Sequence, residues 1–293
     1  MATHKDGDLL KSGCTYICHQ VKRQDVMGIV KKDRASSNLE KVLSWLKNYK
    51  EETNCRGVVL GLSGGKDSTV VAMLAKKVWG AENVFGIIMP NGVQSDIEDA
   101  IEIASTLGIR YPIVNISDAI NSLVRDIELF KGRNHLGEDD WFENCPPISD
   151  KAKTNIPPRI RMTVLYAVAQ SVGYRVIGTG NASEAYIGWT TKWGDSANDF
   201  NPIAHLTCTE VIEIGKILAK DLGLDEKYVN KSPSDGLTGK TDEDNFGFTY
   251  DELDRYIHND ASIPEETALK IERLHAASEH KRQSPNRCNP NIW

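Results

Sequence analysis

The 293-residue chain has no apolar run near the length of about 20 residues that a membrane-spanning helix needs. Its first residues, MATHKDGDLLKSG, contain no apolar stretch after a basic segment, which argues against a secretory signal peptide. The sequence therefore predicts no membrane partner and favours a cytoplasmic location.

Cys-x-x-Cys pairs and an excess of basic residues are also missing. Of the six cysteines, Cys14 and Cys18 lie four apart and precede His19, but no second pair completes a zinc ligand set. Ordinary thiols are the simpler interpretation. The formal net charge of -6 argues against a protein that coats nucleic acid, so no nucleic-acid partner is predicted.

What is present is ordinary globular composition, with 40% hydrophobic and 26% charged residues. The length favours one large domain, either alone or with a small appendage. We expect a single domain over residues 38–293 and an N-terminal extension, residues 1–37, to which no role is assigned. A helix is predicted to start in the stretch 31–49, because Leu39, Val42 and Leu46 recur at helical spacing.

Short β-branched apolar runs alternate with helical patterns along the chain. The predicted strands cover residues 58–62, 84–90, 111–116 and 174–180. The predicted helices follow the first strand up to Gly80, run from Asp96 to Gly108, and cover 116–130 and 157–170. Residues 132–155 carry no sustained periodicity and are predicted to be a loop. This order predicts an α/β fold, a Rossmann-like parallel sheet with helices on both faces, whose ligand crevice lies at the carboxyl ends of the strands.

The stretch GLSGGKDST, residues 61–69, follows the first predicted strand and opens a helix. It does not fit the Walker pattern, because three residues separate Gly61 from Gly65-Lys66 and Asp67 follows the lysine. A strand, a glycine-rich turn and a helix N-terminus still gather backbone N–H groups that suit an anion. A carboxylate in such a loop is reasonable if Mg²⁺ stands between Asp67 and phosphate.

The string Ser-Gly-Gly-x-Asp-Ser resembles the pyrophosphate loop of the N-type ATP pyrophosphatases. Four later stretches together resemble the ammonia-dependent NAD synthetase family: NIPPRIRMTVLYAVAQ (155–170), GTGNASEAYIGWTTKWGDSANDFNPIAHL (178–206), KTDEDNFGFTYDELDRYI (240–257) and HKR (280–282). The resemblance covers roughly residues 38–282. It implies the adenine nucleotide alpha hydrolase-like fold and a homodimer.

The resemblance also implies a reaction. Members of the family condense nicotinic acid adenine dinucleotide (deamido-NAD) with ammonia and consume ATP, giving NAD, AMP and pyrophosphate through an adenylated carboxylate. Glutamine-using relatives carry a separate glutaminase domain, which residues 1–38 are too few to hold. The expected substrates are therefore deamido-NAD, ATP and ammonia, with Mg²⁺ as cofactor.

Each site residue implied by the resemblance has a simpler structural alternative. Glu184 is implied to bind Mg²⁺ with Asp67, yet it stands three residues after Asn181, the spacing of a helix capping box. Catalytic roles fall on Asp67, Glu184 and Lys66, and on Asp195 as a helper in deprotonating ammonium. The expected ATP-binding residues are Gly61, Leu62, Ser63, Gly64, Gly65, Lys66, Asp67, Ser68, Met89, Thr179, Cys208 and Ser234.

The deamido-NAD contacts implied by the resemblance come from three separate stretches, and the residues are Arg159, Lys192, Asp199, His280 and Lys281. Exposed charges such as these are otherwise ordinary solvated side chains. Two departures from the family pattern affect the nucleotide. Many members carry a phosphate-contacting lysine at the position of Cys208, and Gly236 replaces an aspartate beside Ser234.

Two other functions remain open from the sequence. A tRNA-thiolating member would need a basic face and usually paired catalytic cysteines, and neither pattern is present. A non-catalytic nucleotide-binding protein would explain the changes at Cys208 and Gly236, but the combination of Asp67, Glu184 and Lys192 argues against it.

Overall fold

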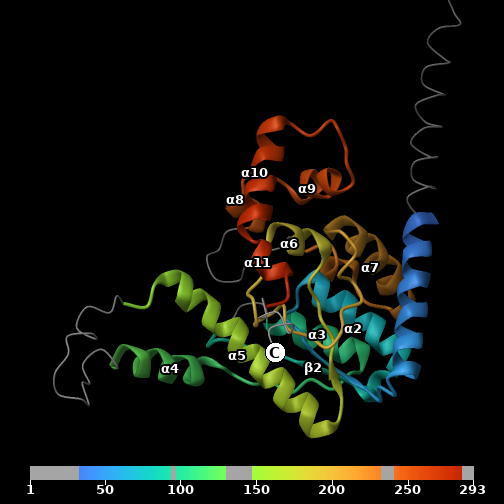
Figure 1. Ribbon diagram of the computed structural model, residues 1–293. Helices are drawn as coiled ribbons and strands as arrows, with labels where there is room; N and C mark the ends of the chain where they lie inside the picture. The colour runs from blue at the N-terminus through green and yellow to red at the C-terminus, as the bar shows by residue number, and fades with distance from the viewer. Residues whose placement is uncertain (1–32, 94–96, 130–146, 232–240, 286–293) are drawn as a thin grey trace, which may run out of the picture.

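The computed structural model describes residues 33–93, 97–129, 147–231 and 241–285. A parallel three-stranded sheet lies at the centre, with strand order β2-β1-β3 (Figure 1). Its strands are β1 (Val58–Gly61), β2 (Val84–Ile87) and β3 (Arg175–Val176). β1 is central because its residues are apolar and almost entirely buried on both faces.

Two further segments extend the ladder without becoming strands. Residues 110–116 run parallel to β2, where the Gly86 amide bonds the Arg110 carbonyl at 2.8 Å and the Val114 amide bonds Ile88 at 2.9 Å. Only isolated bridges form there, so the predicted strand 111–116 is wrong as a strand. Pro112 has no N–H to donate, which interrupts the ladder. The predicted strand 174–180 is likewise reduced to β3 and a bridge between Ile177 and Phe200.

Helices cover both faces of the sheet, as predicted. Val58 and Leu60 face one way and pack with a helix over residues 33–52, α2 (Lys66–Trp79), α3 (Ile97–Leu107) and α7 (Cys208–Leu222). Val59, between them, faces the other way and packs with α4 (Ser117–Leu129) and α5 (Asp150–Val172). This alternation follows from the two-residue period of a strand.

The long helix α5 differs from its prediction. It starts at Asp150, where the Ser149 hydroxyl accepts a hydrogen bond from the Ala152 amide, and so includes residues 150–155 of the predicted loop. Pro157 and Pro158 lie inside it, although proline normally ends a helix because it lacks the N–H donor. Packing of Ile156, Ile160 and Val164 against the sheet outweighs that loss.

The remaining helices form a smaller unit beyond the carboxyl edge of the sheet (Figure 1). They are α6 (Ala182–Ile187), α8 (Asp242–Phe246), α9 (Tyr250–Ile257), α10 (Glu265–Ala277) and α11 (Glu279–Arg282), with 3₁₀ turns at Ala81–Asn83 and Glu226–Tyr228 elsewhere in the chain. Their shared apolar core includes Ile187, Cys208, Phe246, Tyr250 and Leu253. This core connects the unit to the start of α7. The helices found among the described residues are too short or too polar to cross a bilayer.

Candidate active site

A pocket of about 410 Å³ opens at the carboxyl ends of the three strands. The loop after β1 lines it with Ser63, Lys66 and Asp67, and the segment after β3 lines it with Thr179 and Glu184. Met89, after β2, closes a further side. The two strand-to-helix turns singled out in the sequence therefore face the same crevice, as parallel strands require.

The first turn has the form of an anion-binding loop. Gly64 has a φ of 79°, a conformation that a side chain disfavours, and it is followed by the N-terminus of α2, which has no side-chain cap. The hydroxyls of Ser63 and Ser68 lie 3.1 Å apart at the loop. The predicted ATP residues Gly61, Leu62, Ser63, Gly65, Lys66, Asp67 and Ser68 all line the pocket. Gly64 is buried in the same loop.

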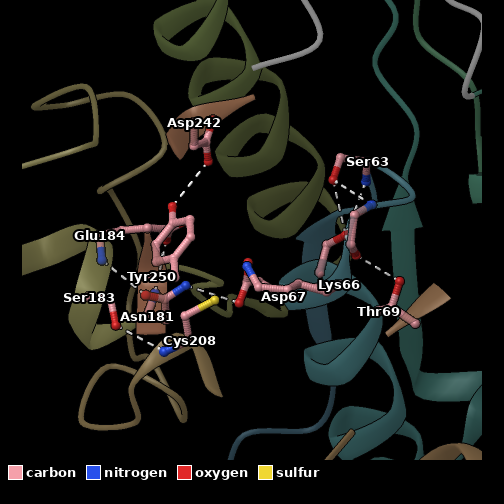
Figure 2. Close-up of polar contacts among 12 residues, drawn as sticks. Ser63, Lys66, Asp67, Thr69, Asn181, Ser183, Glu184, Cys208, Asp242 and Tyr250 are labelled. Carbon is pink, nitrogen blue, oxygen red and sulfur yellow. Dashed lines mark hydrogen bonds and ion pairs between the residues drawn. The ribbon is translucent and has the colours of Figure 1, made fainter. Parts of the chain in front are cut away.

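Asn181 joins the two carboxylates of the site. Its side-chain nitrogen donates to Asp67 Oδ1 at 3.1 Å, and its side-chain oxygen accepts from the Glu184 amide at 3.0 Å (Figure 2). The Asn181 amide donates back to Glu184 Oε2 at 3.1 Å, which completes a capping box at the start of α6. The structural role weighed for Glu184 is therefore present, and the carboxylate faces Asp67 as well.

Electrostatics at this point favour a bound cation. Burial and the Asp67 carboxylate together raise the pKa of Glu184 to about 8, against the opposing effect of the Lys66 ammonium. Two carboxylates offer hard oxygen ligands of the kind that Mg²⁺ prefers, so the residues fit that ion. Within the described ranges no cluster of three or more His, Cys, Asp or Glu side chains occurs, so two carboxylates are the protein's charged ligands for a metal here.

Four of the five predicted dinucleotide residues come together beside the pocket. Arg159 Nε donates to the Lys192 carbonyl at 3.3 Å, and the Lys192 ammonium contacts the His280 carbonyl. Lys281 Nζ donates to the carbonyls of Gly188 and Thr190, each at 2.7 Å. The C-terminal helix α11 is thereby tied to the segment 188–193.

Asp199 is placed elsewhere: its Oδ2 accepts from the Val176 amide of β3 at 2.8 Å. Asp195 lines the pocket, and its two oxygens accept from the Thr190 hydroxyl at 2.6 Å and the Thr191 amide at 2.8 Å. Both carboxylates therefore hold local backbone or loop geometry in addition to any contact with a ligand.

Cys208 lies just behind the pocket lining. It is buried at the first position of α7, its amide donates to Ser183 Oγ at 2.9 Å, and burial raises the pKa of its thiol to about 12. Ser234 and Gly236 lie outside the described residues.

Sequence reasoning missed several pocket residues. Arg161, Lys231 and Asp242 line it, and Tyr250 lies against Lys66. Arg161 stands two residues after Arg159 in one helix, so the sequence could not tell which of the two arginines faces the pocket. In the structure it is Arg161, whose Nε donates to the Met89 carbonyl at 3.2 Å. From the sequence alone, Tyr250 would be assigned to the hydrophobic core as an ordinary aromatic residue.

A family model described as NAD synthase matches residues 38–285. The chain belongs to the NAD synthase family. An NH(3)-dependent NAD(+) synthetase of Pyrococcus horikoshii is 41% identical over 260 residues, covering 84% of this chain and 93% of that protein.

Solved structures agree with this family. NMN synthetase from Francisella tularensis is 32% identical with a TM-score of 0.74, covering 87% of this chain and 98% of its own. The NH3-dependent NAD synthetase of Campylobacter jejuni is 27% identical with a TM-score of 0.66, covering 87% and 99%. The family resemblance and the adenine nucleotide alpha hydrolase-like fold expected from the sequence are thus confirmed.

Proposed function

We propose that the chain amidates deamido-NAD with ammonia, using ATP and releasing NAD, AMP and pyrophosphate. One observation carries the proposal: in a member of the NAD synthase family, Asp67 and Glu184 face one pocket from two neighbouring strand-to-helix turns, beside a glycine-rich loop. That arrangement suits cleavage of ATP between its α- and β-phosphates.

The chemistry needs an activated carboxylate. An oxygen of the nicotinate carboxylate attacks the α-phosphorus, the bond to the β-phosphate oxygen breaks, and pyrophosphate departs. Ammonia then attacks the carbonyl carbon of the mixed anhydride, and AMP leaves with the bonding electrons. The loop amides and the Lys66 ammonium stabilise negative charge on the departing group. The pocket walls limit the access of water, which would hydrolyse the adenylate.

Mg²⁺ belongs to this proposal because the donor set fits it. Asp67 and Glu184 would hold the ion, and it would supply charge stabilisation for the phosphate oxygens. Burial and the neighbouring Asp67 carboxylate raise the pKa of Glu184, and a cation between the two carboxylates would offset both effects, which supports the assignment.

For the dinucleotide we propose Arg159, Lys192, His280 and Lys281, supported by their convergence beside the pocket. Asp199 is the fifth proposed contact, and its Oδ2 also accepts a hydrogen bond from the Val176 amide. Asp195 would accept a proton from ammonium at the pocket wall.

A homodimer completes the proposal. Leu123 and Ile127 of α4 are exposed by 39% and 43%, and a second copy of the chain would cover them. α4 lies on the face of the sheet that carries α5, away from the C-terminal helices (Figure 1).

The test measures NAD and pyrophosphate after mixing the protein with ATP, magnesium chloride, ammonium chloride and deamido-NAD. We expect both products in equal amounts, little activity with glutamine as nitrogen donor, and a loss of activity of about a hundredfold or more in Asp67→Asn.

A parallel reaction tests the substrate, with nicotinic acid mononucleotide in place of the dinucleotide, because one structural relative is an NMN synthetase. A preference for the mononucleotide would overturn the substrate assignment, and no ATP cleavage with either would favour a non-catalytic protein.

A further inference from the structure

The Lys66 ammonium is buried, with 3% of the residue exposed, yet it lines the pocket. A lysine ammonium has three hydrogen-bond donors. In the described part of the chain a single acceptor meets them, Asp67 Oδ2 at 2.7 Å. Leaving two donors of a buried cation unmatched is costly, so this group is arranged to receive anionic oxygens from a ligand in the pocket.

The second neighbour of Lys66 is an aromatic ring from a distant part of the chain. Its Nζ lies 5.4 Å from the centre of the Tyr250 ring, within the range of a cation–π contact. Such a contact leaves the N–H groups available to a ligand, unlike a second carboxylate. The ring thus attracts the ammonium without supplying an oxygen acceptor to its remaining donors.

Tyr250 is itself held in place. It is 4% exposed, and its hydroxyl donates to Asp242 Oδ2 at 3.0 Å (Figure 2). Its amide donates to Glu243 Oε1 at 2.8 Å. Asp242 and Glu243 belong to α8, and Tyr250 begins α9. The position of the ring therefore depends on the docking of α8 and α9 over the phosphate loop.

We propose that Tyr250 is a positioning residue, which holds the Lys66 ammonium against the pocket so that its donors meet the phosphate oxygens of bound ATP. The inference rests on the proposed function for the identity of the nucleotide. It makes the C-terminal helices part of the phosphate site and assigns a role to a tyrosine that would otherwise be a core aromatic.

The test uses calorimetric binding of α,β-methylene-ATP with magnesium chloride to the full chain, which needs no turnover. Lys66→Gln removes the charged donors and weakens binding about a hundredfold. Tyr250→Leu removes the ring and weakens it about tenfold, whereas Tyr250→Phe keeps the ring and stays within about threefold of the parent. Tyr256→Leu, on the same helix α9 but bonded to Glu272, is the matched control and leaves affinity unchanged.

A double substitution separates positioning from general stability. If Tyr250 acts through Lys66, adding Tyr250→Leu to Lys66→Gln weakens binding by less than about twofold more. Full tenfold additivity, parental affinity in Tyr250→Leu, or parental affinity in Lys66→Gln would each overturn the proposal. Tyr250→Met, which fills the volume without a ring, replaces the leucine variant if that one does not fold. Reduced analogue binding in these variants, with no NAD formed by the parent, would uphold this inference and sink the proposed function.

Discussion

Glu184 shows how one side chain serves two demands at this site. Its Oε2 completes the capping box with the Asn181 amide, which fixes the start of α6. The same carboxylate is buried near Asp67, and burial together with the negative charge of Asp67 raises its pKa to about 8. Without a cation the ionised form is therefore a local source of instability, which is a common feature of active sites.

We predict that Glu184→Gln stabilises the metal-free protein in alkaline solution while abolishing activity. Between the ordinary pKa of 4.5 and the folded value of about 8, the folded state keeps a proton that the unfolded state has lost. The free energy of unfolding of the parent therefore falls as pH rises through this window. Glutamine keeps the capping geometry and has no proton to lose.

Urea unfolding between pH 5 and pH 8, in the presence of a chelator, measures this effect. The parent should lose stability over that range relative to the variant. Equal pH dependence of the two proteins would show that Glu184 is already ionised at pH 5.

Lys66 and Cys208 share a neighbour, the Tyr250 ring. Both residues lie beside Tyr250, Lys66 through its ammonium and Cys208 through the small core it shares with the ring. We predict that Cys208→Lys partly restores ATP affinity to Lys66→Gln, because a lysine at the first position of α7 can bring its ammonium to the same ring.

The Michaelis constant for ATP, with NAD formation as readout, measures the rescue. The single variant Cys208→Lys provides the control, since two ammonium groups in one niche repel each other and should lower activity. If the double variant had the same Michaelis constant for ATP as Lys66→Gln, the result would contradict the idea that the two side chains reach the same place beside Tyr250.

At the element scale, a single carboxylate joins three helices. Asp254, on α9, is 3% exposed and accepts from the Ser183 hydroxyl at 2.5 Å and the Thr209 amide at 2.8 Å. Ser183 belongs to α6 and Thr209 to the first turn of α7. Asp254 thus fixes two helix starts that point toward the pocket, and it ties the C-terminal unit to the sheet.

We predict that Asp254→Ala destabilises the protein by about 3 kcal/mol, because buried donors on α6 and α7 lose their acceptor. The midpoint and slope of urea unfolding measure this cost. Asp251→Ala is the matched control on the same helix: that side chain is 68% exposed and its pairing with Arg255 at 3.5 Å contributes little. A loss as small as that of the control would show that the network is dispensable.

At the scale of the whole molecule, the two faces of the sheet end differently. One face is closed by α2, α3, α7 and the helix 33–52, whereas on the other face α4 remains largely exposed beside α5. Figure 1 shows α4 and α5 extending from the body of the molecule, on a different side from α9 and α10. A second copy packing on this exposed side would leave the phosphate loop and the C-terminal helices accessible.

We predict that Leu123→Glu combined with Ile127→Glu converts a dimer to a monomer. The two side chains are four residues apart, on one side of α4, and buried carboxylates would oppose association. Light scattering coupled to size-exclusion chromatography gives the mass. Ser122→Glu, which adds charge off this stripe, should leave the dimer intact, and a monomeric parent would contradict the proposal.

The amino-acid order alone determined the chain's local character and family. Short β-branched apolar runs defined the strands around residues 58–62 and 84–90, and Gly80 and Gly108 ended helices. The Ser-Gly-Gly-x-Asp-Ser string after a strand indicated a phosphate site. These signals are readable because they depend on neighbours within a few residues. Pro112 and Pro157 misled the prediction because a single residue's preference competed with packing from elsewhere in the chain.

Only the tertiary structure decided which side chains meet. Asn181 between Asp67 and Glu184, and Tyr250 against Lys66, join residues 114 or more positions apart, so no local pattern encodes them. Which of two nearby arginines faces the pocket depended on the rotation of α5 against the sheet. Burial and charge at the site follow from that packing, and with them the raised pKa of Glu184 and the unmatched donors of Lys66.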